Sequence, residues 1–313
     1  MKIFTFAVLT AASAPSLMAC DLCSIYTAQA AEGSGRGVYV GVAEQFTHYG
    51  TLREDGVSVP NTVNQYLDSS VAQLFAGYNF SQRFGVQFNA PLIDRSYQRP
   101  RGDVIEQGHL SGLGDVSLTA NWIACQQSTE EFTFNWTVLG GVKFPTGDSS
   151  RLGEPEVENE PPLPASGIAG HDLALGSGSF DGVVGTGFST RCKRVFLNGN
   201  MQYAIRSEGD FQHEYANDWT WAGGPGVYLA LNNRYTLTAQ AVVSGESKGK
   251  DTFASEPDND SAATIVYLGP QVNFTWSSKL SAQVGADFPV SIANTGLQIV
   301  PDWRVRAALT WHF

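Results

Sequence analysis

Four cysteines are the most reactive side chains in this sequence, and they fall into two pairs. Cys20 and Cys23 form a CxxC motif, whereas Cys125 and Cys192 lie much further along the chain. In an oxidising compartment an even number of cysteines favours disulfides, so we expect Cys20 to pair with Cys23 and Cys125 to pair with Cys192. Three alternatives remain open for the first pair: lipidation of Cys20 after the lipobox-like Leu17-Met18-Ala19, disulfide exchange, or binding of a soft metal such as copper or zinc.

Histidines are the residues that could support hydrolysis. His109-Leu110-Ser111 and His171-Asp172 are the suggestive neighbours for such a role. A Ser-His pair must be held rigidly at hydrogen-bond distance, and neither segment matches the motifs of the outer-membrane phospholipase or protease families. The acidic stretches at 145–177 and 247–260 match the spacing of no calcium loop. We therefore expect no enzyme activity, no catalytic residues and no cofactor.

Alternating apolar and polar residues dominate the chain after residue 36 and predict β-strands. In the last segment one row is apolar (Trp303, Val305, Ala307, Leu309, Trp311, Phe313) and the other is mostly polar (Arg304, Arg306, Ala308, Thr310, His312). A helix would mix the two rows, whereas a strand sends them to opposite faces.

About twelve such segments are each near the length that crosses a bilayer at a tilt. They are 36–48, 69–80, 84–93, 113–124, 131–144, 178–190, 194–206, 218–231, 234–246, 261–276, 279–291 and 301–313. Short turns alternate with longer polar stretches near 49–68, 94–112, 145–177, 207–217, 247–260 and 292–300. This pattern predicts an all-β fold: a transmembrane antiparallel up-and-down β-barrel of about 12 strands, with short periplasmic turns and long extracellular loops. A soluble β-sandwich would also alternate, but strands of about eleven residues exceed its usual length.

Aromatic residues gather where the predicted strands end, as in the girdles of membrane barrels. They include Tyr78, Phe80, Trp122, Phe144, Trp219, Trp221 and Trp276. The terminal Phe313, with Trp311 two residues before it, resembles the signal that barrel-assembly machinery recognises. We therefore expect outer-membrane lipid and that machinery to be partners of the chain.

Charged residues on the polar rows would face the interior of such a barrel. Asp115, Lys143, Arg206, Asp287, Arg304 and Arg306 fall in its outer half and are the candidate pore-lining, selectivity-determining residues. Opposed charges at one level would create a transverse field and a constriction. The same residues could instead form salt bridges that brace the wall, and both alternatives stay open. The other predicted lining residues are Asn and Gln, which suit a conduit for small solutes.

The N-terminal residues predict where in the cell the protein is located. Residues 1–19 have the charged start, short apolar core and small-residue exit of a signal peptide. Residues 20–35 are then a periplasmic N-terminal segment with the CxxC motif, and 36–313 are the barrel. The expected location is the outer membrane of a Gram-negative bacterium. A formal net charge of −11 with no Lys/Arg cluster argues against nucleic acid as a partner.

Three Gly-rich segments carry a family resemblance: 112–116, 140–148 and 175–178. They resemble turns of the bacterial transporter-like family named for a MetA pathway of phenol degradation. The resemblance implies an outer-membrane channel. We therefore expect passive uptake or efflux of small-molecule solutes, with aromatic and other carbon compounds as candidates. A plugged barrel with a binding or structural role, using the periplasmic CxxC as a metal or partner site, is the alternative, and a barrel hydrolase is a weaker one.

Overall fold

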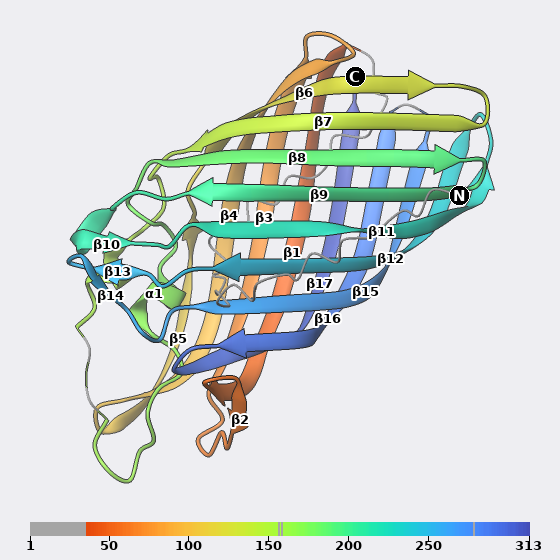
Figure 1. The fold of residues 1–313 in the computed structure, drawn as a ribbon. Helices are drawn as coiled ribbons and strands as arrows, with labels where there is room; N and C mark the ends of the chain where they lie inside the picture. The colour runs from red at the N-terminus through yellow and green to blue at the C-terminus, as the bar shows by residue number, and fades with distance from the viewer. Residues whose placement is uncertain (1–35, 156, 158, 278) are drawn as a thin grey trace, which may run out of the picture.

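The computed structural model describes residues 36–155, 157, 159–277 and 279–313, and these form one closed antiparallel barrel (Figure 1). Twelve strands make the wall: β1 (Gly37–Glu54), β3 (Tyr66–Asn79), β4 (Phe84–Arg101), β6 (Ser117–Ser128), β7 (Phe132–Lys143), β8 (Asp181–Cys192), β9 (Val195–Ile205), β11 (Asp218–Leu231), β12 (Tyr235–Lys248), β15 (Ala263–Trp276), β16 (Leu280–Asn294) and β17 (Leu297–His312). Each pairs with its neighbours in chain order, and β1 pairs with β17, from Tyr39 opposite His312 to Glu54 opposite Leu297. This pairing closes the wall, so the predicted fold class is confirmed.

Side-chain alternation divides the wall into an apolar outer surface and a polar inner one. On β1, Val38, Val40 and Val42 are exposed on the outside, whereas Gln45 and Thr47 are buried on the inside. The other strands repeat this pattern, with exposed outward residues such as Phe88, Leu92, Trp136, Val272, Val305 and Leu309. An outer apolar surface of this extent is stable against lipid, and closure gives every ladder N–H and C=O a partner.

The stretch 94–112, expected to be a loop, is instead a projecting hairpin. β4 continues to Arg101 and pairs with β5 (Val104–Leu113). β4 pairs with β6 from Phe84 to Asn89 and with β5 from Leu92 to Arg101, so β5 and β6 lie one after the other along the same edge of β4. The prediction failed because charged residues suggested solvent, whereas Arg95 and Arg99 point inward and are buried.

The stretch 292–300 was also wrongly predicted as a long loop. β16 and β17 are joined by the tight turn Thr295-Gly296, in which Gly296 has a φ of +60°. The left-handed conformation favours glycine because it lacks a Cβ. The side chain of Asn294 fixes the turn by donating to the backbone oxygens of Arg53 and Gly296, both at 3.0 Å.

Small elements gather at one end of the barrel, opposite the short turns. They are β2 (Val57–Val59), the helix α1 (Gly170–Leu173), and a three-stranded sheet of β10 (His213–Glu214), β13 (Thr252–Phe253) and β14 (Glu256–Pro257), at the left and lower end of Figure 1. This is the end that the sequence analysis assigned to the outside of the cell, and we call it the outer end. Within the described part of the chain, no helix is long and apolar enough to cross a membrane.

Candidate channel and its outer lid

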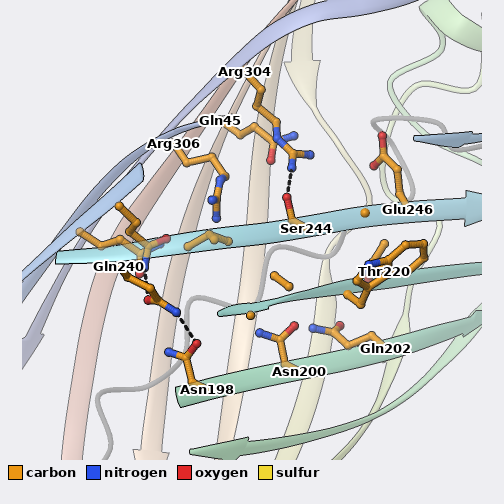
Figure 2. Close-up of a pocket in the computed structure, with 17 residues that line it drawn as sticks. Gln45, Asn198, Asn200, Gln202, Thr220, Gln240, Ser244, Glu246, Arg304 and Arg306 are labelled. Carbon is orange, nitrogen blue, oxygen red and sulfur yellow. Dashed lines mark hydrogen bonds between the residues drawn. The ribbon is translucent and has the colours of Figure 1, made fainter. Parts of the chain in front are cut away.

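Amide side chains are the largest group among the residues that line the cavity inside the barrel. Asn198, Asn200 and Gln202 follow one another along β9, and Gln240 lies on β12 (Figure 2). Gln271 of β15 and Gln283 of β16 line the same cavity. Gln240 donates to Asn198, which links two of these strands across the inner surface. Every one of these six was predicted to line the lumen. Amides offer both donors and acceptors without net charge, so this wall can hydrate or bind polar solutes.

A cluster of five charged residues is buried on one side of the inner wall near the outer end. Lys143 Nζ lies 2.6 Å from Asp115 and 2.8 Å from Asp181. Arg206 lies 2.8 Å from Asp181 and 2.6 Å from Asp218. The cluster joins β7, β8, β9 and β11 and holds Asp115 at the start of β6. Of these five, the sequence analysis missed Asp181 and Asp218, although each is the first residue of a strand and follows a long polar stretch.

A second charged cluster lies on the opposite part of the wall. Asp287 of β16 is fully buried and accepts from both Arg304, at 3.0 Å, and Arg306, at 2.7 and 2.9 Å. Arg304 also donates to Ser244 of β12 (Figure 2). Its guanidinium stacks over the Tyr267 ring, 4.0 Å from the ring centroid. All six predicted charged residues thus lie inside the barrel, but within each cluster basic and acidic groups touch. These contacts support the bracing alternative. The first cluster nevertheless holds two cations and three carboxylates and the second two cations and one carboxylate, so opposite net charges still face each other across the lumen and the selectivity alternative stays open.

The connection between β7 and β8 folds back across the outer mouth. We call residues 144–180 the lid; of these, 156 and 158 lie outside the described residues. In the sheet, β17, β16, β15, β12, β11, β9 and β8 follow one another, so β8 and β17 lie on opposite sides of the barrel. Nevertheless, the backbone N–H of Ile299 in β17 donates to Gly167 of the lid at 2.8 Å. The lid therefore spans the mouth.

An apolar layer fastens the lid to the wall. Ile168 and Leu173 of the lid pack against one residue from each of four strands, Leu52, Leu67, Tyr97 and Ile299. We call these six residues the apolar seal. Leu173 is 0 % exposed and Ile168 2 %. Burial of side chains of this size stabilises a packed arrangement by roughly 1.5–3 kcal/mol each. The lid is therefore held against the barrel wall by packing.

Ion pairs at the rim hold the lid from a second direction. Arg99 and Arg101 of β4 both contact Glu154 of the lid, and Arg99 also contacts Glu106 of β5 at 2.9 Å. Arg151 of the lid donates to the Tyr97 hydroxyl at 3.2 Å. The projecting β4–β5 hairpin is therefore one of the anchor points of the lid.

A titratable cluster joins α1 to the neighbouring loop. The ring of His171 stacks on His213 at 6.0 Å and lies near Asp172 and Asp258, at 3.4 and 3.8 Å. Burial disfavours the charged imidazolium, but the negative charges of Asp172, Asp251 and Asp258 outweigh this effect and that of Lys248, so the pKa of His171 is raised. Asp251 lies in the connection that follows β12, and burial disfavours its charged form. Its carboxylate lies 2.6 Å from Lys248 Nζ, and together with His213 and His171 this lysine holds the pKa of Asp251 well below its ordinary value.

The expected disulfide between Cys125 and Cys192 is wrong. Both thiols are free, and β7 lies between their strands, because Cys125 pairs with Trp136 and Cys192 with Phe132. Two strand spacings are about 9.5 Å, beyond the roughly 7 Å limit between Cα atoms for a disulfide. Cys20 and Cys23, with their disulfide, lipid and metal alternatives, lie outside the described residues. Trp311 faces outward and Phe313 is exposed after β17; their role in assembly stays a prediction.

His109 does approach a serine and an acid, although not the expected serine. Its Nδ1 lies 3.2 Å from the Ser96 hydroxyl and its Nε2 lies 3.2 Å from Asp94, on the outer face of the β4–β5 hairpin. Ser96 pairs with His109 and Asp94 with Ser111, so the local backbone groups belong to the β4–β5 ladder. The barrel hydrolase stays an untested alternative.

Comparison with known proteins supports the architecture. No family model matches the sequence, and no curated protein matches it. The structure is similar to the crystal structure of an outer membrane channel from Pseudomonas putida F1, with a TM-score of 0.63 and 17 % identity over 90 % of this chain and 97 % of that one. The fold is that of an outer-membrane β-barrel. The NanC porin and the CymD monoaromatic hydrocarbon channel are more distant, each with a TM-score of 0.40 and 8 % identity. The resemblance to the phenol-degradation family stays a prediction.

Proposed function

We propose that this protein is a channel in the outer membrane of a Gram-negative bacterium, through which small solutes diffuse down their own gradients. The single observation that carries the proposal is a closed barrel that is apolar outside and lined by amides inside. A soluble protein has no use for such an inverted surface, whereas lipid favours the outside and a polar solute the inside. Aromatic and other carbon compounds are candidate solutes, and the protein itself would perform no chemistry on them.

The docked lid sets the condition for passage. Its apolar seal and rim ion pairs stand between the amide-lined cavity and the outer mouth. Solutes therefore pass when the lid swings away from β17, and the channel is expected to show long closed periods. This feature also favours a second candidate, a permanently plugged barrel that binds a ligand or displays its loops.

Planar-bilayer conductance of the purified protein separates the two candidates. We expect discrete current steps with long closures, and longer openings in a variant whose lid residues 149–174 are replaced by a short Gly-Ser linker. A barrel that stays silent both with its lid and without it would contradict the channel and favour the plugged barrel. Heat-modifiable migration of both proteins on gels would verify that each barrel is folded.

Localisation is tested independently of conduction. The mature protein is expected in the outer-membrane fraction, extractable only with detergent, because the outward rows of all twelve strands require lipid. Recovery of a monomer from the aqueous fraction without detergent would overturn the proposal at its first step.

A further inference from the structure

A row of buried polar side chains crosses four neighbouring strands directly beneath the apolar seal. The pairing places Arg304 of β17 opposite Thr47 of β1, Thr47 opposite Ser69 of β3, and Ser69 opposite Arg95 of β4. All four point inward, and Thr47, Ser69 and Arg95 are each 1 % exposed. Facing residues on adjacent strands have Cβ atoms roughly 4.5–5.5 Å apart, so these groups form one continuous strip of the wall.

Three adjacent polar atoms in this row have no hydrogen-bond partner. They are Thr47 Oγ1, Ser69 Oγ and Arg95 Nε. Buried polar atoms are nearly always paired, because an unmade hydrogen bond costs the full desolvation of the group. Three consecutive exceptions on three consecutive strands therefore indicate a place built for something that arrives from elsewhere.

Arg95 also lacks the counter-charge that the other luminal arginines have. Among the described residues no carboxylate lies within ion-pair distance of Arg95, whereas Arg304 and Arg306 share Asp287 and Arg99 contacts two glutamates. The guanidinium donates instead to the backbone oxygen of Asp172 in the lid. A buried charge without an opposite partner is unfavourable, so this site attracts an anion.

We propose that Arg95, Ser69 and Thr47 bind the carboxylate group of a small anionic solute, which replaces the Asp172 oxygen on Arg95 as the lid lifts. The planar guanidinium fits a carboxylate, and the two hydroxyls donate to its free oxygen lone pairs. Leu67 and Tyr97 of the apolar seal lie next to the site on the same strands. They receive the apolar body of the solute, which favours an aromatic carboxylate. The inference rests on the proposed channel function, because the solute reaches the site through the lumen or past the lid.

Calorimetric titration of the full-length protein in detergent micelles with sodium benzoate tests the site. We expect benzoate to bind and the neutral analogue benzamide not to bind. Arg95→Gln should weaken benzoate at least about tenfold, because hydrogen bonds to charged groups are the strong ones. Arg95→Lys should restore part of the affinity, and Ser69→Ala should weaken binding while keeping the charge. The matched control is Thr119→Val, since Thr119 is also buried on the inner wall but its hydroxyl already donates to the backbone oxygen of Gln87.

The outcomes separate this inference from the channel proposal. Absence of benzoate binding, or equal affinity in the wild type, Arg95→Gln and Ser69→Ala, would overturn the anion site even if the barrel conducts. Binding that depends on Arg95 and Ser69 in a barrel that is silent in planar bilayers would uphold the site and overturn the channel. Unfolding of the Arg95→Gln variant leaves the test intact, because Ser69→Ala and Arg95→Lys keep the buried charge.

Discussion

Leu173 is the residue whose truncation best tests whether the lid is a removable gate. Its side chain is 0 % exposed and lies within the apolar seal, on the four-residue helix α1. Leu→Ala at a fully buried position costs about 2–5 kcal/mol, from lost transfer free energy and the cavity left behind. Because Leu173 contacts the wall only when the lid is docked, this cost falls on the docked state.

The expected change in lid opening follows from that cost. Each 1.4 kcal/mol is a factor of ten in an equilibrium constant, so Leu173→Ala should raise the undocked fraction at least about 30-fold. The ladder of the barrel wall does not involve Leu173, so overall stability of the barrel should change little.

Limited trypsin digestion reads this equilibrium directly. Arg151 is the single Lys or Arg between residues 144 and 180, so cleavage after it reports on the lid alone. When opening is fast relative to cleavage, the cleavage rate follows the open population. We expect the rate, measured by mass spectrometry on the folded barrel, to rise about 30-fold or more in Leu173→Ala, and channel openings to lengthen.

The matched control is Leu309→Ala, the same truncation on the lipid-facing side of β17, where Leu309 is 47 % exposed. It should cleave at the wild-type rate. A Leu173→Ala protein that also cleaves at the wild-type rate would refute the argument, because docking would then not depend on the apolar seal.

Three further predictions concern the lid, the wall and the thiols. Because the pKa of His171 is raised, protonated His171 stabilises the docked lid fully at pH values below the ordinary pKa of histidine, and this stabilisation is lost as pH rises through the raised pKa. The open probability of the channel should therefore rise with pH. A His171→Gln channel with the same pH dependence would contradict this. Lys143→Met removes one positive partner from each of two buried aspartates and should lower the free energy of unfolding in urea by about 3–5 kcal/mol. Lys193→Met, at the exposed Lys193–Glu131 contact, should lower it by about 0–1 kcal/mol. Equal effects would argue against a braced wall. In a Cys20→Ser, Cys23→Ser background, mass spectrometry should find two free thiols with Cys192 the faster to alkylate, and a mass lower by one disulfide would contradict the strand order.

Period-two alternation made the wall predictable from sequence. The facing of Arg304, Arg306 and the amides of β9 follows from position parity alone, because neighbouring residues of a strand must point to opposite sides. The twelve strands and their order were predictable for the same reason. Their lengths were not, because charged residues such as Arg99 look like loop residues until the folded barrel brings them to an opposite charge.

The sequence alone could not predict which charged residues contact one another. Lys143 was expected inside, but its contact with Asp181 depends on the stagger between strands, which alternation does not determine. The docking of Leu173 depends on where a long connection lands across the mouth. The expected Cys125–Cys192 disulfide failed for a related reason, since an even number of cysteines does not show that β7 lies between the two strands that carry them.

The pairing of β1 with β17 has a consequence for biogenesis. β1, the first strand of the wall, has β17 as its partner on one side, so both edges of the sheet stay unpaired until both strands are present. Open edges are templates for aggregation, and pairing over such a sequence separation is slow. The chain of the outer-membrane channel proposed here must therefore be kept from aggregating until β17 is available, and loss of either β1 or β17 would leave a wall that cannot close.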